Sequence, residues 1–408
     1  MNKALDAISI ALASIWANKL RSFMMVLGNI VAVTSIIAVV SLIQGMNAYV
    51  GDAILREVGA GTFRIDRLGI ITNADDEEEA SRRNPNVSNL DLQALRGASP
   101  AISAVMAEAS VPADVAFRDI EVEAVRVRGV SAEYQDFSTY SAALGRLPSP
   151  LEIDRNRPVA VVGAETADKL FKGRQAVGQT IRLGGSHFTV VAVNEKKGAL
   201  FGQSQDDFVV IPLGRLLQLF GSRRSLEITV RPRAPELLSA AMDDARVAMR
   251  VQRRLRPKEP DNFGIFTSDT LVDLWRTFSR GAFAVLIGIV SLSLVVGGIV
   301  IMNIMLMVVS ERTREIGLRK ALGARRRDIA RQVLTESTTL SLVGGVFGTI
   351  LGLAAALALS LFSPIPAAVE VWSVLLGVGM TAAVGLVFGL YPALRAARLD
   401  PIEALRRE

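Results

Sequence analysis

The sequence has no cysteine and only one histidine, His187, among its 408 residues. Disulfides and thiolate metal sites are therefore excluded. A site that requires two histidines, such as the HExxH zinc site of metallopeptidases, is excluded as well. Half of the residues are hydrophobic, which is typical of a membrane protein that also carries a large water-exposed part.

The central part of the sequence lacks an excess of either charge. Residues 46–280 contain 31 basic and 31 acidic residues, a difference of zero, whereas the remainder contains 15 basic and 9 acidic residues, so the net charge of +6 lies there. A nucleic-acid-binding protein would concentrate basic residues on its water-exposed domain, so we expect no nucleic-acid partner. Basic residues beside membrane spans favour the cytoplasmic side and attract anionic membrane lipid.

Four long apolar stretches without charge predict four transmembrane helices. The first, 24–43, is too long for a signal peptide and no cleavage site follows it. The second, 282–309, has 28 residues and would be about 42 Å long, so it must tilt or project beyond the bilayer. The others are 340–362 and 371–394, joined by residues 363–370, which lack Lys and Arg and predict an external turn.

The predicted fold class is an α-helical membrane protein with four transmembrane helices and a large α+β extracytoplasmic domain between the first and second spans. Basic residues near both termini and between the second and third spans predict that these segments are cytoplasmic. The predicted segments are an amphipathic interfacial helix (1–20), span 1 (21–46), a periplasmic domain (47–279), span 2 with a stalk (280–310), a cytoplasmic coupling loop (311–332), span 3 (333–363), span 4 (371–394) and a cytoplasmic tail (395–408).

The domain between the first two spans mixes strand and helix patterns, and we expect two subdomains. An alternation of apolar residues over 120–127 predicts a strand with one slip. Gly184 and Gly185 predict a hairpin turn, and Ser88 or Asn89 predicts a helix start. The acidic run within 71–86 predicts a disordered loop.

Candidate catalytic motifs are incomplete. Residues 161–165 lie at a predicted strand–helix junction but lack the lysine and spacing of a phosphate-binding loop. Residues 202–206 lack the final glycine of a nucleophile elbow. His187 enters an apolar strand and is interpreted as structural. We therefore predict no catalytic, cofactor-binding or metal-binding residue, and no enzyme activity in this chain.

Small residues recur at four-residue spacing in the last two spans. Such spacing allows helix backbones to approach closely, although glycine is also simply common in membrane helices. Asn29, Thr34 and Ser35 in the first span predict a face that meets another helix, in this chain or in a second copy. The candidate span-packing residues are Gly344, Gly348, Gly352, Gly385 and Gly389.

The segment between spans 2 and 3 is dense in charge, with eight basic and three acidic residues over 311–331. Ile316, Leu318 and Leu322 predict a short helix that buries apolar side chains in a partner groove while its charges set the register. Gly323 predicts the end of that helix. The alternative is a solvated basic loop that faces lipid headgroups.

This segment, ERTREIGLRKALGARRRDI, resembles the shared cytoplasmic loop of FtsX-like ABC transporter permeases. The terminal GLVFGLYPALRAARLDPIEALRRE resembles the end motif of that family, and NKLRSFMMVLGNIVAV its first span. The stretch RPVAVVGAETADKLF and the later AVGQTIRLGGSHFTVVAV and DDFVVIPL resemble the MacB-type periplasmic domain. The resemblance covers nearly the whole chain.

The resemblance implies a permease in the bacterial inner membrane, joined to two copies of an ABC ATPase that carries ATP and Mg. It also implies a second permease chain, in a homodimer or heterodimer, and possible contact with a periplasmic adaptor and an outer-membrane channel. Because the sequence begins at the interfacial helix, we expect the ATPase on a separate subunit. The implied ATPase-coupling residues are Glu315, Arg319, Lys320, Leu322, Gly323 and Arg325.

Four apolar spans per chain offer no polar channel, so we expect mechanotransmission, in which ATP hydrolysis moves the external domain and drives efflux of a substrate. Two alternatives remain open at this stage. One is a permease that releases lipoproteins, and the other is a membrane regulator of a periplasmic hydrolase that transports nothing.

Overall fold

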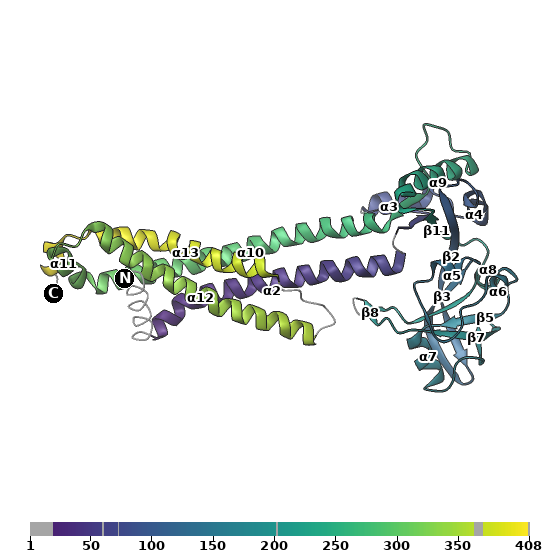
Figure 1. Cartoon of the computed structure of the whole chain (residues 1–408), viewed down its shortest axis with the longest axis horizontal. Helices are drawn as coiled ribbons and strands as arrows, with labels where there is room; N and C mark the ends of the chain where they lie inside the picture. Colours follow the sequence, from purple (N-terminus) through teal and green to yellow (C-terminus); the bar gives the residue numbers. More distant parts are fainter. Residues whose placement is uncertain (1–18, 59–60, 72, 201–202, 363–369, 407–408) are drawn as a thin grey trace. The chain divides into compact units, whose positions relative to one another are not determined.

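The computed structural model describes residues 19–58, 61–71, 73–200, 203–362 and 370–406 (Figure 1). The chain divides into a helical unit, formed by its two ends, and a sheet domain that covers Val50–Leu274. The predicted helix over 1–20 and the predicted turn over 363–370 lie almost wholly outside the described residues.

Four helices in the described residues are long and apolar enough to cross a membrane. They are α2 (Lys19–Val58), α10 (Ser268–Glu311), α12 (Arg326–Phe362) and α13 (Val371–Arg398). The predicted fold class is confirmed, but all four helices extend beyond the predicted spans. At 1.5 Å per residue, the 44 residues of α10 extend about 66 Å, twice the thickness of the hydrocarbon layer.

The sheet domain is built on one ten-stranded sheet. Its strands, with the separate hairpin β8–β9, are β1 (Phe63–Asp66), β2 (Ile102–Phe117), β3 (Ile120–Val130), β4 (Ala142–Gly145), β5 (Val159–Val162), β6 (Thr180–Leu183), β7 (Ser186–Asn194), β8 (Ala199–Leu200), β9 (Gln203–Ser204), β10 (Phe208–Pro212), β11 (Glu227–Pro232) and β12 (Gly264–Thr267).

The long strand β2 belongs to two differently built parts of this sheet. Its first half pairs with β11, in an open arrangement that continues through β1 to β12. Its second half pairs with β6, which also pairs with β7, so the order β2–β3–β10–β5–β7–β6 closes into a ring. The two predicted subdomains are therefore joined by a shared strand.

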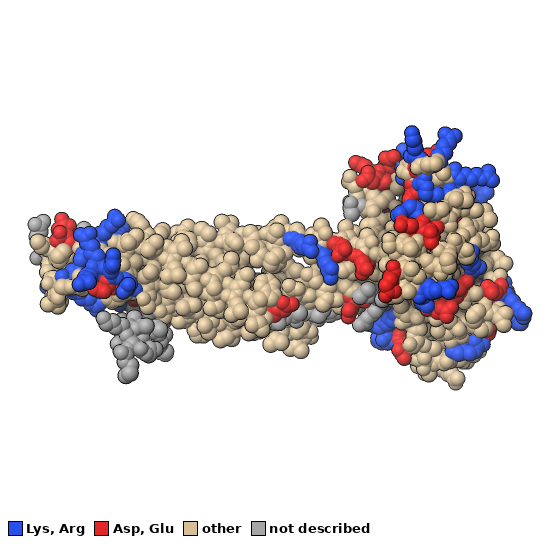
Figure 2. Space-filling view, turned by 45° about the horizontal axis from the view of Figure 1, so that its top comes forward, with Lys and Arg blue, Asp and Glu red and all other residues tan. Residues whose placement is uncertain are grey.

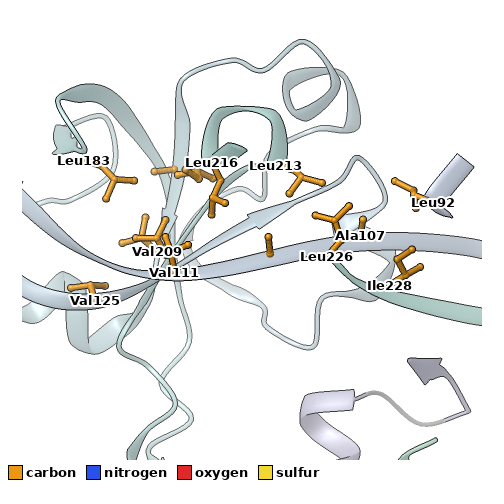
Figure 3. Packing of buried hydrophobic residues seen from close by; sticks show 14 of the residues in the cluster. Leu92, Ala107, Val111, Val125, Leu183, Val209, Leu213, Leu216, Leu226 and Ile228 are labelled. Carbon is orange, nitrogen blue, oxygen red and sulfur yellow. The ribbon is translucent and has the colours of Figure 1, made fainter. Parts of the chain in front are cut away.

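The larger buried cluster of the sheet domain lies on one face of this sheet, and a smaller one that includes Met106, Val161 and Val210 lies on the other face. Apolar side chains of β2, including Ala107 and Val111, meet Leu213 and Leu216 of α8 and Ile228 of β11 (Figure 3). The helices of the domain are α3 (Ala74–Arg83), α4 (Asn89–Leu95), α5 (Tyr134–Phe137), α6 (Pro150–Asp154), α7 (Ala164–Phe171), α8 (Leu213–Phe220), the short 3₁₀ helix η1 (Pro235–Leu237) and α9 (Leu238–Gln252).

Local sequence signals agree with this domain at several points. The hairpin turns at Gly184 and Gly185, and the exposed His187 lies in β7 just after it. The slip in the alternation of β3 is a β-bulge, where Ala124 adopts a φ of 54° and its N–H donates to Asp114. Ser88 precedes α4, and its N–H donates to Asp91 Oδ2 at 2.8 Å.

The predicted disordered loop over 71–86 is wrong, because it contains α3. Acidic residues occupy the first turn of α3, and Arg82 and Arg83 the last turn, which complements the helix dipole. The end of α3 is anchored by Asn84, whose side chain donates to the Arg67 carbonyl while Arg67 Nε donates back to the Asn84 carbonyl, each at 2.8 Å. Charge density alone therefore did not indicate disorder here.

One buried ion pair ties α4 to the segment after α9. Asp91 accepts from Nε and Nη2 of Arg253, each at 3.1 Å, and the two side chains are 5% and 7% exposed. Arg253 also donates to the carbonyl of Asn262 at 2.8 Å. Asp91 accepts hydrogen bonds both from the Ser88 N–H at the start of α4 and from the buried guanidinium of Arg253. Removal of one partner therefore leaves the other buried without its pair.

We expect Asp91→Ala to destabilise the sheet domain by about 3–5 kcal/mol, because it leaves Arg253 buried and unpaired and removes the cap of α4. Hydrogen exchange of peptides from α4 and α9 in the purified full chain measures the effect. Arg82→Ala is the control, since its pair with Glu78 is exposed and contributes less than about 1 kcal/mol. Equal protection in the two variants would contradict the assignment.

Candidate functional site

The charged segment between α10 and α12 folds into a short helix, α11 (Thr313–Ala321), that is almost continuous with α10. It ends as predicted at Gly323, which has a φ of +99°. The Gly323 N–H donates to the Lys320 carbonyl, and the Ala324 N–H donates to the Arg319 carbonyl. This pair of bonds is the Schellman arrangement, which favours glycine at the left-handed position. The chain then turns into α12.

Arg319 braces α11 against α12. One guanidinium nitrogen donates to Gln332 at 2.7 Å, and another pairs with Glu315 of α11 at 2.6 Å. Nearby, Arg312 pairs with the largely buried Glu336 of α12 at 3.4 Å. These contacts hold α11 in a defined position relative to the third span.

Lys320 connects α11 to the end of the fourth span. Its ammonium group donates to the carbonyl of Ala397 at 3.0 Å and to the carbonyl of Leu399. Ala397 lies in the last turn of α13 and Leu399 directly follows the helix. Helix ends of this kind leave unpaired carbonyl acceptors, and a positive charge is favourable there. Lys320 therefore acts as a cap for α13 in addition to being part of α11.

A last helix, α14 (Pro401–Arg406), packs on α11. A Cβ placed on Gly317 would lie 2.6 Å from the Cβ of Ala404, so only glycine allows this approach. The segment predicted as a cytoplasmic tail, 395–408, contains the end of α13 and this packed helix. No local signal marked Gly317 as an interhelical contact.

The apolar residues of α11 divide between two environments. Ile316 is 8% exposed and belongs to a cluster with Met305 of α10 and Val333 of α12. The prediction that Ile316 enters a groove on a partner is therefore wrong. Leu318 and Leu322 are 53% and 80% exposed. Figure 2 shows Lys and Arg side chains gathered at this end of the helical unit.

The six candidate coupling residues therefore occupy one short helix and its exit turn, but they face different ways. Glu315, Arg319 and Lys320 bond within the chain, as described above. Leu322 and the side chain of Arg325 are exposed. The three charged residues of α11 hold the helix in place, Leu322 and Arg325 lie on the surface, and Gly323 lies at the turn between α11 and α12.

Three candidate span-packing glycines line the contact between α12 and α2. A Cβ placed on Gly348 would lie 2.8 Å from the Cβ of Val33 and 2.9 Å from the carbonyl oxygen of Ile30. A Cβ on Gly344 or Gly352 would lie 2.9 Å from a side chain of α2. Side chains larger than hydrogen therefore require these helices to separate.

The other two glycines line the contact between α13 and α12, which lie side by side in Figure 1. A Cβ on Gly385 would lie 2.8 Å from the Cα of Thr338, and Gly389 faces Ser337. The hydroxyl of Ser337 donates to the Gly385 carbonyl at 3.1 Å. Sequence reasoning missed a further contact, where a Cβ on Gly28 of α2 would meet the Cα of Gly297 of α10 at 2.9 Å.

Polar residues of the first span face helices of the same chain. The hydroxyl of Thr34 donates to the Gly348 carbonyl at 3.1 Å. Asn29 is fully buried, and neither of its side-chain polar atoms has a hydrogen-bond partner among the described residues. For Asn29 and Thr34, the neighbour that we expected is supplied by α12 of the same chain.

Three charged residues on neighbouring strands of the sheet, Glu108, Arg128 and Glu227, contact one another across the strands. Glu227 of β11 lies directly opposite Glu108 of β2, and burial together with the Glu108 charge raises the pKa of Glu227. Burial also opposes ionisation of Glu108, but the paired Arg128, at 2.5 and 2.7 Å, outweighs it and lowers the pKa of Glu108. The shifted pKa values of these residues are therefore explained by contacts between neighbouring strands of the sheet.

We expect Gly348→Leu to destabilise the helical unit by about 1–3 kcal/mol or more, because the added side chain meets the backbone of α2. Thermal unfolding of the detergent-solubilised chain, followed by size exclusion, measures the loss. Gly379→Leu is the matched control, since Gly379 is an exposed span glycine with no atom within 4 Å of its Cβ position. Equal melting temperatures would contradict the close contact.

Comparison with known proteins gives a family match for each of two parts of the chain. Residues 22–248 match the MacB-like periplasmic core domain, and residues 287–401 match the FtsX-like permease C-terminal region. The crystal structure of the periplasmic region of MacB from Actinobacillus actinomycetemcomitans aligns with 54% of this chain and 94% of that one, with 19% identity and a TM-score of 0.45.

Two relatives are similar over almost the whole chain. The macrolide export ATP-binding/permease protein MacB of Bdellovibrio bacteriovorus is 33% identical over 96% of this chain, which spans only 60% of that protein. The uncharacterized ABC transporter permease YknZ of Bacillus subtilis is 30% identical, over 99% of each chain. The chain therefore belongs to the family of ABC transporter permeases in which a MacB-like periplasmic core domain precedes an FtsX-like C-terminal region.

Proposed function

We propose that this chain is a permease subunit that works by mechanotransmission, in which a partner ATPase hydrolyses ATP and the permease converts the conformational change into work beyond the membrane. The observation that carries the proposal is α11, a short helix braced from within at Arg319 and Lys320 while Leu318 and Leu322 remain exposed. A braced helix with an exposed apolar face can receive a force and pass it to the spans that hold it.

The composition of the spans argues against a polar path through one chain. The apolar stretches of the four helices contain no charged residue, and buried polar side chains such as Ser337 and Thr34 bond to backbone carbonyls of neighbouring helices. A polar or charged substrate would lose its hydration without compensation there. Motion of packed helices is the remaining way to transmit work across the bilayer.

The helices suit such motion because they are long and continuous. The 44 residues of α10 lead without interruption to Glu311, directly before α11. A rigid helix carries a displacement along its length, whereas a flexible loop absorbs it. We infer that a stroke at α11 moves α10, and that the ATPase biases a two-state equilibrium of the permease.

We propose an orientation in which α11 and both termini are cytoplasmic and the sheet domain is periplasmic, with efflux of a substrate from the periplasmic side as the outcome. The exposed arginines around α11 support this orientation, since basic residues beside spans stay cytoplasmic. The macrolide in the name of the Bdellovibrio relative suggests a drug-like substrate class. A second permease copy and two ATPase copies, each supplied with ATP and Mg, complete the proposed assembly.

Labelling of single cysteines tests the orientation, because the chain has no cysteine of its own. We expect Leu151→Cys in the sheet domain to react with a membrane-impermeant maleimide in spheroplasts. Leu322→Cys should react only after the membrane is permeabilised. The two leucines are 63% and 80% exposed, so accessibility within the protein does not distinguish them. Labelling of both from the same side would reject the proposal.

Two substitutions at the exit of α11 test the coupling. Gly323→Pro removes the N–H that donates to the Lys320 carbonyl, and proline cannot adopt the φ of +99° found here. Arg325→Glu inverts an exposed charge. We expect each to reduce permease-stimulated ATP turnover of the reconstituted complex by about tenfold or more, the effect of about 1.4 kcal/mol.

The control for this experiment is Arg82→Glu, which inverts an exposed charge in the sheet domain. Membrane insertion of all variants should equal that of the unmodified chain, since none of the changes lies within a span. Full ATP turnover in both the Gly323→Pro and Arg325→Glu variants would show that this turn does not couple the two subunits.

A further inference from the structure

The junction between α10 and α11 is a break in an otherwise continuous helix, and it lies at Arg312. The backbone of Arg312 has a ψ of 14°, whereas a residue inside an α-helix has a ψ of about −42°. Next to it, the hydroxyl of Thr313 donates to the carbonyls of Val309 and Ser310 at 3.1 and 2.8 Å. A side chain that bonds to carbonyls of the preceding turn bends a helix. The junction is therefore a point at which α11 can change its angle to α10.

The side chain of Arg312 ties this junction to α12. Its guanidinium group pairs with Glu336 at 3.4 Å, and the two side chains are 38% and 11% exposed. A buried carboxylate in a helix that crosses the membrane requires a positive partner. Arg319 donates to Gln332, one helical turn before Glu336. Two adjacent turns of α12 therefore hold α11, one near its start and one near its end.

A cavity interrupts the packing between these two contacts. It has a volume of about 30 Å³ and lies between α10, α11 and α12, where Met305, Ile316 and Val333 line it together with Arg312 and Glu336. Such a space accommodates about two water molecules. Closely packed side chains resist small displacements, whereas this space allows α11 to shift toward α12. The angle of α11 therefore depends on the polar contacts more than on the packing beneath it.

We propose that the junction between α10 and α11 is a hinge, and that Arg312 and Glu336 form a latch that holds it at one angle. The inference rests on the proposed function and adds the contact that makes the two helices move together. While the latch is closed, a displacement of α11 turns α10. When the latch is broken, the hinge absorbs the displacement and the spans do not receive it.

Arg312 and Glu336 are positioning residues in this arrangement. They act on the angle of α11, whereas the exposed Leu318 and Leu322 remain available to the ATPase whether the latch is closed or broken. Loss of the latch should therefore separate two quantities that loss of the docking surface would change together. The affinity for the ATPase should be kept, and the stimulation of its ATP turnover should fall.

Neutral substitutions test the latch in the full chain, reconstituted in nanodiscs with the ATPase subunit. We expect Arg312→Met and Glu336→Gln each to lower permease-stimulated ATP turnover by about tenfold, with the double variant at about the same level, because residues that act through one contact are not additive. The affinity for the ATPase should change by less than about twofold. The double variant leaves neither charge of the pair unpaired, so it also tests the latch if a single variant does not fold.

The matched control is Arg314→Met, which removes an exposed positive charge of α11 two residues from Arg312. It should keep full turnover. A loss equal to that of Arg312→Met would overturn the latch, because it would show that positive charge near the junction matters and the pair does not.

The other outcomes separate the latch from the proposed function. If the unmodified chain does not stimulate ATP turnover, the proposed function fails and the latch fails with it. If the unmodified chain does so and the double variant does too, the latch is wrong and the proposed function stands. The latch is equally wrong if the losses of the two single variants multiply to about a hundredfold, or if the affinity for the ATPase falls in step with turnover.

The angle of α11 can also be measured directly, because the chain has no cysteine of its own. Nitroxide labels at Leu322→Cys and Leu361→Cys, which replace leucines that are 80% and 79% exposed, report the distance between the end of α11 and the far end of α12. Without the ATPase, pulsed electron paramagnetic resonance should give a narrow distribution of distances, and a broader one after Arg312→Met is added. Equal widths would overturn the hinge.

Discussion

The arrangement of the helical unit depends on close approach of helix backbones at small residues. In hydrocarbon, apolar side chains gain nothing from leaving lipid for protein, so association of helices relies on contact over short distances and on hydrogen bonds between them. Gly344, Gly348 and Gly352 of α12 face α2, and Gly385 and Gly389 of α13 face α12. A close approach of the same kind occurs between α11 and α14, where the missing side chain of Gly317 makes room for Ala404. Helices packed this closely are suited to moving together, as the proposed mechanotransmission requires.

The contacts that hold α11 are of a different kind from those that hold the spans. Arg319 and Lys320 use charged donors to bind Gln332 and the terminal carbonyls of α13. These bonds are directional, so they define the angle of α11 as well as its distance from the spans. They are also only partly buried, so their individual contribution to stability is small. Their value is therefore in geometry, while the glycine contacts and the apolar cluster around Ile316 supply most of the cohesion.

The features that could be predicted from sequence are those that a single segment determines. The spans follow from uncharged length, the turn at Gly323 from glycine after a helical pattern, and the β-bulge at Ala124 from a slip in alternation. The features that could not be predicted need a partner distant in the sequence. The ring closed by β6 against β2 depends on residues more than 60 positions apart, and the burial of Ile316 depends on α10 and α12. The acidic helix α3 was misjudged because its anchor, between Arg67 and Asn84, is a tertiary contact.

A sequence motif also does not show in which direction its side chains point in the folded chain. Glu315, Arg319, Lys320 and Leu322 are neighbours in sequence, and a helical pattern alone gives each the same chance of meeting a partner. In the folded chain Arg319 and Lys320 reach residues of α12 and of the end of α13, whereas Leu322 is left outside and Ile316 is buried. This arrangement agrees with the proposed role of α11, because Arg319 and Lys320 hold the helix in position while Leu322 stays exposed to a partner. Under that proposal, the contacts of Arg319 and Lys320 determine where the helix lies, and Leu322 contributes to what it binds.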